Sequence, residues 1–120
     1  MSAQNPHGLS QLRDALRQFA AARDWDQFHS PKNLAAALSV EAAELLEIFQ
    51  WLTEEESRNL PPAELAKVRD EMADVLNYLV RLADKLDVNL LEAARDKVKR
   101  NAEKYPVEKS RGHARKYSEL

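Results

Sequence analysis

The positions of the helix-breaking residues constrain the fold of this chain more than any other feature of its sequence. It contains only two glycines, Gly8 and Gly112, and its five prolines lie between segments of helical periodicity rather than inside them. Proline removes a backbone donor and clashes with the preceding turn, so it marks helix boundaries. No segment keeps the alternating period of a strand for long. The sequence therefore predicts an all-α fold.

The periodicity predicts four main helices over residues 10–25, 31–52, 63–86 and 90–104. Ser30 followed by Pro31 is a strong start signal, because serine caps a helix N-terminus and proline fits its first turn. Ser10 is expected to cap the first helix in the same way. Thr53 and Glu56 have the spacing of a capping box and predict a short extra turn of helix before the next prolines.

Length and composition limit the chain to one small domain. It has 120 residues, of which 44% are hydrophobic, enough for one core but not for two. We expect the domain to span residues 10–106, and residues 107–120 to form a charged tail that is loosely ordered unless a neighbour holds it. A small domain with a polar pocket often completes its core with a partner subunit, so a helical-bundle oligomer is expected.

Charge and residue types exclude several classes of protein. The formal charge is −2, with 18 basic and 20 acidic residues interspersed, so neither nucleic acid nor an anionic membrane is expected as the principal partner. Cysteine is absent, which excludes disulfides, thiolate zinc sites and cysteine nucleophiles. The first ten residues lack the apolar core of a signal peptide, and no apolar run approaches the length of a membrane span. We therefore expect a cytoplasmic protein.

Two pairs of acidic residues, each three positions apart, are the strongest indication of function. Glu41 and Glu44 form the first pair, and Glu71 and Asp74 form the second. Residues three apart on a helix project from one face, with Cβ atoms about 5 to 6 Å apart. Four such acids on two facing helices would make a site for a hard cation.

The first pair carries more weight because Glu41 falls in the middle of an apolar stripe. That stripe comprises Leu34, Leu38, Leu45, Ile48 and Leu52. A buried carboxylate without a partner costs roughly several kcal/mol even after relaxation. Glu41 therefore needs a cation, a protein partner or a proton. The second pair fits a solvated helix face equally well, because Asp74 shares a polar face with Asp70, Asn77 and Arg81.

Oxygen ligands without a nearby histidine favour Mg²⁺ as the bound ion. A redox di-iron bundle is the obvious rival, but it requires a Glu-x-x-His element on two helices, and neither acidic pair has one. His7, His29 and His113 all lie outside the helices that carry the acids. Metal-assisted hydrolysis of a phosphoanhydride is therefore favoured over oxygen chemistry.

Aromatic residues flank the helix of the first acidic pair. Trp25, Phe28 and His29 precede it, Trp51 follows Glu44 by seven residues, and Tyr78 follows Asp74 by one turn of helix. Flat side chains beside a metal site could stack on a nucleobase. Tryptophans are also common as core or interface anchors, so this clue is open by itself.

A donor-rich face is expected on the last helix. Lys97, Asn101, Lys104 and Tyr105 recur there at spacings of four, three and one, and their groups suit phosphate oxygens. A helix dipole alone explains a lysine in the final turn, but it does not explain Asn101.

The order of these elements resembles the all-α nucleoside triphosphate pyrophosphohydrolases of the MazG-like group. The pattern is Glu41-Ala-Ala-Glu44, then Glu71-Met-Ala-Asp74, then Lys97, Asn101 and Lys104-Tyr105-Pro106. Flanking segments at residues 23–29, 31–34, 49–51 and 115–120 are similar to the dCTP pyrophosphatase branch. The resemblance runs from about residue 10 to the C-terminus. Where some members of that branch carry a histidine in the first helix, this chain has Leu16.

The resemblance implies a Mg²⁺-dependent enzyme that hydrolyses a deoxynucleoside triphosphate, most closely dCTP or a modified dCTP, to the monophosphate and pyrophosphate. It also implies a homodimer or a homotetramer made from two dimers. By position, Glu41, Glu44, Glu71 and Asp74 would hold the metal. Trp25 and Trp51 would enclose the base with His29 and Tyr78 near it, while Lys97, Asn101 and Tyr105 would meet the phosphates.

A rival hypothesis is a non-catalytic helical interaction module. In that case the tryptophans would anchor a partner, and the acids would form ion pairs with Lys67, Arg69 or Arg81. The two hypotheses differ in whether Mg²⁺ supports binding of a triphosphate.

Overall fold

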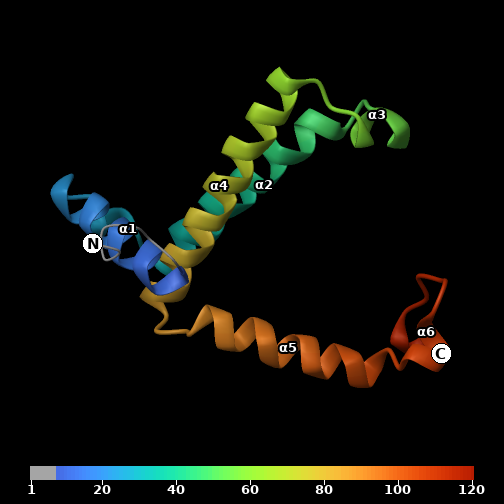
Figure 1. Ribbon diagram of the computed structural model, residues 1–120. Coiled ribbons are helices and arrows are strands. Elements are labelled where there is room, and N and C mark those ends of the chain that lie inside the picture. The colour runs from blue at the N-terminus through green and yellow to red at the C-terminus, as the bar shows by residue number, and fades with distance from the viewer. Residues whose placement is uncertain (1–7) are drawn as a thin grey trace. The chain divides into compact units, whose positions relative to one another are not determined.

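The computed structural model describes residues Gly8–Leu120, so His7 lies outside the described residues. Over that range the chain is helical with connecting turns and contains no strand, which confirms the predicted all-α class. The elements in chain order, of which Figure 1 labels the α-helices, are α1 (Leu9–Ala22), η2 (Asp26–Phe28), α2 (Pro31–Phe49), α3 (Glu54–Arg58), α4 (Pro62–Lys85), α5 (Leu90–Lys104), α6 (Val107–Ser110) and η3 (Tyr117–Glu119). The chain forms two compact units, which divide between Val88 and Asn89.

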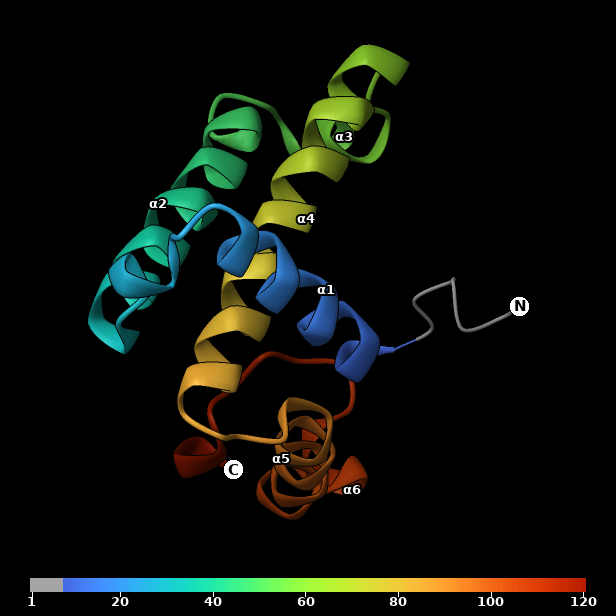
Figure 2. The same ribbon diagram turned by 90° about the vertical axis from the view of Figure 1, so that its left-hand side faces the viewer.

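The first unit is built on a pair of long helices. Helices α2 and α4 lie side by side and run in opposite directions, with the short helix α3 in the connection between them (Figures 1 and 2). Helix α1 packs against α4 as well. Helix α4 therefore contacts both of the other long helices in this unit and positions the residues that face it.

Side-chain caps mark the beginnings of α2 and α3 where the sequence predicted them. The Oγ of Ser30 accepts a hydrogen bond from the backbone N–H of Asn33 at 3.1 Å, and Pro31 occupies the first turn of α2. Thr53 and Glu56 form the reciprocal capping box of α3, with hydrogen bonds of 3.1 Å and 2.8 Å. These caps set where α2 begins and where the chain turns towards α4.

The predicted cap of α1 is wrong. This helix begins at Leu9 with Gly8 as its extended N-cap residue and no side-chain cap, so Ser10 lies inside the first turn. Its end at Ala22 also comes earlier than predicted, because Asp24 adopts a left-handed backbone conformation with φ of 53°. Helix α2 likewise ends at Phe49 rather than near residue 52, whereas α5 has the predicted bounds.

The second unit consists of α5 followed by a tail that contains α6 and η3. Tyr117 of η3 packs edge-on against Tyr105 at the end of α5, with ring centroids 6.2 Å apart. The Nζ of Lys104 lies 4.8 Å from the centre of the Tyr117 ring, as a cation–π contact. The tail therefore folds back onto the end of its own helix.

The buried core is small for a chain of this length. Its apolar members are Ala20, Leu34, Val68, Val80 and Ala83. Many large apolar side chains are exposed instead, among them Val40, Leu46, Leu65, Met72 and Leu76 on α2 and α4. In the part of the chain that the structure describes, no helix is both long enough and apolar enough to cross a membrane.

Candidate metal and nucleotide site

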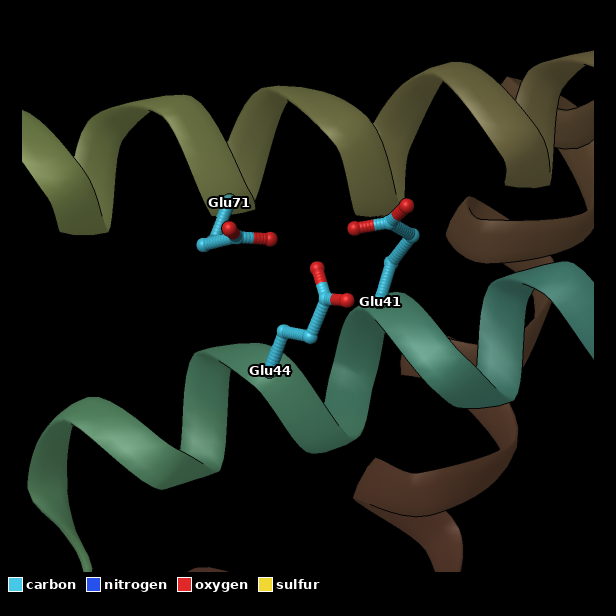
Figure 3. Close-up of side chains that lie close together, drawn as sticks. All are labelled: Glu41, Glu44 and Glu71. Atoms are coloured by element: carbon cyan, nitrogen blue, oxygen red, sulfur yellow. The ribbon is translucent and has the colours of Figure 1, made fainter.

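Three carboxylates converge between α2 and α4. Glu41 and Glu44 project from α2 towards α4, and Glu71 projects from α4 towards them (Figure 3). One oxygen from each residue lies within 4.8 Å of the others. The structure therefore brings together three of the four acids that the sequence singled out.

The apolar stripe of α2 explains why Glu41 faces α4. Leu34 lies two helical turns before Glu41, on nearly the same face, and only 1% of its surface is exposed. The face of α2 that buries Leu34 therefore also directs Glu41 towards α4. Glu44, three positions later, follows on the same side.

The cluster is short of hydrogen-bond donors. Glu41 and Glu71 each have a buried Oε2 atom without a hydrogen-bond partner. Burial raises the pKa of Glu41 to about 7, and hydrogen bonding to Glu44 and Glu71 and the charges of Glu44 and Asp74 act in the same direction. Burial also raises the pKa of Glu71, while its hydrogen bond with Glu41 opposes that shift. Without a cation, the pair is therefore expected to hold a proton that the ordinary carboxyl pKa would not retain.

The composition of the cluster suits a hard divalent cation. All of its ligand atoms are carboxylate oxygens, which Mg²⁺ prefers and which carry enough negative charge to balance it. Two of these oxygens are buried and lack a donor, so a cation would satisfy atoms that the protein itself leaves unsatisfied. The residues present therefore fit the ion that the sequence predicted.

Asp74 lies outside the three-carboxylate cluster. It is exposed on α4, one turn after Glu71. Its charge nevertheless raises the pKa of both Glu41 and Glu71, so it lies close enough to act on them electrostatically. Its role as a fourth ligand stays a prediction.

The acids do not form the ion pairs that the interaction-module hypothesis requires. Lys67 pairs with Glu64 at 3.3 Å, and Arg81 pairs with Asp26 and Asp84. Within residues 8–120, the structure gives no salt bridge to any of the four candidate acids. Basic partners therefore do not account for this cluster of negative charge.

The two tryptophans flank α2 in the chain. Trp25 precedes that helix and is 45% exposed, while Trp51 follows it and is 87% exposed. All 19 residues of α2 lie between them in the sequence, a helix about 28 Å long at 1.5 Å per residue. A whole helix therefore separates the two candidate stacking residues along the chain.

His29 contacts α4 through Arg81, which the sequence did not indicate as part of the nucleotide site. Its Nδ1 accepts a hydrogen bond of 3.1 Å from the Nε of Arg81, which is 6% exposed. Tyr78 is half-buried and lies three residues before Arg81 on the same helix. No local pattern could have paired Arg81 with His29, because the two are 52 positions apart in the chain.

The candidate phosphate-binding residues lie on the second unit. Lys97 and Asn101 are exposed on α5, one turn apart, and Tyr105 is half-buried at its C-terminal end. This arrangement keeps the side chains on one helix, as the spacing predicted.

Comparison with known proteins gives consistent results. Residues 36–120 match the MazG-like family. The chain is 46% identical to dCTP pyrophosphatase 1 of Mus musculus and 44% identical to that of Homo sapiens, in each case over 93% of this chain and 67% of the relative. A crystal structure of a pyrophosphatase from Archaeoglobus fulgidus superposes with a TM-score of 0.78 and 43% identity, covering 85% of this chain and 95% of that one.

Proposed function

Because the chain belongs to the MazG-like family and is an all-α nucleoside triphosphate pyrophosphohydrolase, we propose that it hydrolyses dCTP or a modified dCTP to the monophosphate and pyrophosphate, with Mg²⁺ as its cofactor. The observation that carries the Mg²⁺ dependence is the pair of buried, unsatisfied oxygens of Glu41 and Glu71. The similarity to dCTP pyrophosphatases supports the substrate. A deoxynucleoside triphosphate is an intracellular substrate, so we expect the enzyme to act on the nucleotide pool of the cytoplasm.

The acidic residues would divide the work of holding the metal. Glu41, Glu44 and Glu71 would bind it between α2 and α4, and Asp74 would approach from the exposed edge. Bound Mg²⁺ supplies neutralisation of the triphosphate and a lowered pKa for a coordinated water. A carboxylate oxygen of the cluster that is not used to hold the ion would accept the proton of the attacking water.

The remaining candidates would bind the two ends of the substrate. Trp25, His29 and Tyr78 would contact the nucleoside, because Tyr78 lies on the half of α4 that follows the acids and the segment of Trp25 and His29 is bonded to that half through Arg81. Lys97, Asn101 and Tyr105 would donate hydrogen bonds to phosphate oxygens and stabilise the charge that develops there.

We further propose that a second copy of the chain completes the base-binding site. Since α2, a helix about 28 Å long, lies between Trp25 and Trp51 in the chain, a base enclosed by both rings would take Trp51 from a partner. The many exposed apolar side chains of α2 and α4 would supply the interface. A symmetric dimer would then hold two composite sites.

The proposed reaction is tested with a panel of nucleotides. Wild-type protein with Mg²⁺ is incubated with dCTP, 5-substituted dCTP, dUTP, dTTP and the purine nucleotides, and the release of pyrophosphate is distinguished from that of orthophosphate. We expect pyrophosphate from dCTP or its analogues at the highest kcat/KM. Absence of pyrophosphate with every nucleotide would refute the proposed function.

The composite site is tested by mixing two inactive variants. Trp25→Ala and Trp51→Ala should each weaken turnover, because each removes one of the two stacking surfaces. The two variants are unfolded and refolded together in equal amounts, so that about half of the random dimers are mixed and each mixed dimer has one intact site of its two. The mixture should therefore recover about a quarter of wild-type activity. No recovery in a mixture shown to contain mixed dimers would contradict the shared site.

A further inference from the structure

Arg81, which is 6% exposed, is the only charged residue that is buried within residues 8–120, and it lies at the centre of a network of opposite charges. Its Nη2 donates to Asp26 at 2.5 Å, its Nη1 to Asp84 at 3.3 Å, and its Nε to Nδ1 of His29. Each of the three guanidinium nitrogens therefore has its own acceptor. The pyrophosphohydrolase reaction as described above makes no use of this buried cation.

Two of these three acceptors belong to one short segment before α2. Asp26 and His29 lie at the two ends of a tight turn, which is closed by hydrogen bonds from the N–H of Phe28 to the carbonyl of Trp25 and from the N–H of His29 to that of Asp26. Lys85 also donates to Asp26 at 2.5 Å. A single guanidinium thus fixes both ends of the segment that carries Trp25 and His29 to helix α4.

Helix α4 also carries acids of the metal site. Arg81 follows Asp74 by seven residues, which is two turns and about 10 Å along the helix axis. A rigid helix therefore sets the distance between the acids and the segment that Arg81 holds. Such fixed spacing is what a site needs if it binds a substrate by two ends at once.

The contact with Arg81 also determines which nitrogen of His29 carries the proton. Arginine can only donate, so Nδ1 of His29 has to be the unprotonated acceptor, and the proton of the neutral ring lies on Nε2. Burial lowers the pKa of His29, the charges of Arg81 and Lys85 lower it further, and Asp26 opposes them. In the described part of the chain Nε2 has no hydrogen-bond partner, so a neutral donor is left available.

We propose that Arg81 is a positioning residue for the nucleoside end of the site: it ties the Trp25–His29 segment to α4 and holds His29 as a neutral ring whose Nε2–H donates to the acceptor edge of the substrate's base. This inference rests on the proposed nucleotide substrate. It adds a residue, a tautomer and a hydrogen-bond direction to that site. A base with ring nitrogen or carbonyl acceptors would match this donor, whereas an imidazolium would carry an unneeded charge into the pocket.

The variant Arg81→Met tests the proposal, because the structure leaves no carboxylate without a cation when Arg81 is removed. Asp84 keeps its two hydrogen bonds from Arg17, at 2.7 Å and 2.5 Å, and Asp26 keeps Lys85. The matched control is Lys85→Met, which removes a neighbouring cation that touches Asp26 but not His29.

Steady-state kinetics with dCTP and Mg²⁺ give the first readout. We expect Arg81→Met to raise KM about tenfold with kcat changed less than about threefold, because it loosens binding of the base without touching the acids. Lys85→Met should change KM less than about twofold. An unchanged KM in folded Arg81→Met, or an equal rise in the control, would overturn the proposal.

Nitrogen-15 magnetic resonance of the imidazole rings gives the second readout and requires no turnover. Wild-type His29, assigned by its loss in His29→Asn, should show a protonated Nε2 and an unprotonated Nδ1 at pH 7, and Arg81→Met should show mixed tautomers. A proton on Nδ1, or an imidazolium, in the wild-type protein would overturn the proposal even if Arg81→Met fails to fold. A wild-type protein that hydrolyses no nucleotide would instead refute the proposed function, and the resonance measurement would still decide the tautomer.

Discussion

Two clusters of charged residues include side chains of helix α4, and they differ in how their charges are balanced. The carboxylate cluster of Glu41, Glu44 and Glu71 gathers like charges and leaves two buried oxygens without partners. The arginine cluster, which comprises Arg17, Asp26, Arg81, Asp84 and Lys85 with His29, pairs each carboxylate with two cations. Both clusters lie in the first compact unit.

The difference separates a site that needs a ligand from one that the protein completes by itself. Like charges at close range cost free energy unless a cation or proton neutralises them. Paired charges with all donors satisfied instead hold backbone segments together. We therefore assign the carboxylate cluster to metal binding and Arg81, at the centre of the arginine cluster, to positioning, and substitutions should affect the two clusters in different ways.

Removal of one charge from the carboxylate cluster should have the largest effect, and it should fall on activity. Glu41→Gln keeps the shape of the side chain but removes a charge opposite the metal, so kcat/KM should fall by about a thousandfold. The free energy of unfolding of the metal-free protein should stay the same or rise, because repulsion is relieved. Pyrophosphate release and urea denaturation measure the two quantities, and wild-type activity in this variant would remove Glu41 from the site.

Removal of a carboxylate from the arginine cluster should affect chiefly stability. Asp84, whose side chain is 9% exposed, accepts hydrogen bonds from Arg17 and Arg81, so Asp84→Asn should cost about 3 kcal/mol of unfolding free energy. Lys67→Ala breaks an exposed pair with Glu64 and should cost less than about 0.5 kcal/mol. Similar denaturation midpoints for both variants would contradict a structural role for the arginine cluster.

Added Mg²⁺ should stabilise the protein through the carboxylate cluster alone. At a concentration one hundred times the Kd, binding to the folded state adds about 2.7 kcal/mol to the unfolding free energy. Thermal unfolding with Mg²⁺ or with a chelator should show this shift in wild-type protein and in Asp84→Asn, but not in Glu41→Gln. An equal shift in Glu41→Gln would mean that the ion binds elsewhere.

The pH dependence of stability should have opposite signs for the two clusters. In metal-free protein the pKa of Glu41 is raised to about 7, so its contribution to stability falls as pH rises from about 4.5 to 7. The pKa of Asp84 is lowered, chiefly by its hydrogen bond with Arg17, so its contribution is present above about pH 4 and is lost as pH falls through the lowered value. When the unfolding free energy is measured across pH, Glu41→Gln should lack the fall in stability between about pH 4.5 and 7, and Asp84→Asn should lack the loss of stability at low pH. A wild-type slope in either variant would contradict that assignment.

Local chemistry explains which features of the fold were predictable from the sequence. Caps such as Ser30 and the Thr53–Glu56 box depend on residues three apart, so the sequence alone predicts them. The N-cap residue of α1 is Gly8 rather than Ser10, and the sequence did not reveal it because a glycine has no side chain to act as a cap. The prediction that Glu41 faces a partner helix followed from helical periodicity alone.

Contacts between distant segments explain what the sequence did not reveal. Arg81 was assigned to a polar helix face, yet it is buried because Asp26, 55 positions away, and Asp84 accept its hydrogen bonds. The two tryptophans were expected around one base, and the bounds of α2 place a whole helix between them in the chain. Periodicity describes one helix at a time and contains no information about which segments meet.

Metal binding by the carboxylate cluster is the central claim, and electron paramagnetic resonance with Mn²⁺ in place of Mg²⁺ tests it most directly. Free Mn²⁺ gives a signal that is lost on binding, so titrations measure affinity without any turnover. The control is Glu47→Gln, which removes an exposed carboxylate from the same helix as Glu41. We predict that wild-type protein and Glu47→Gln bind Mn²⁺ with the same Kd, and that Glu41→Gln and Glu71→Gln bind at least about tenfold more weakly. Equal affinity in all four proteins would contradict the assignment of the metal to this cluster.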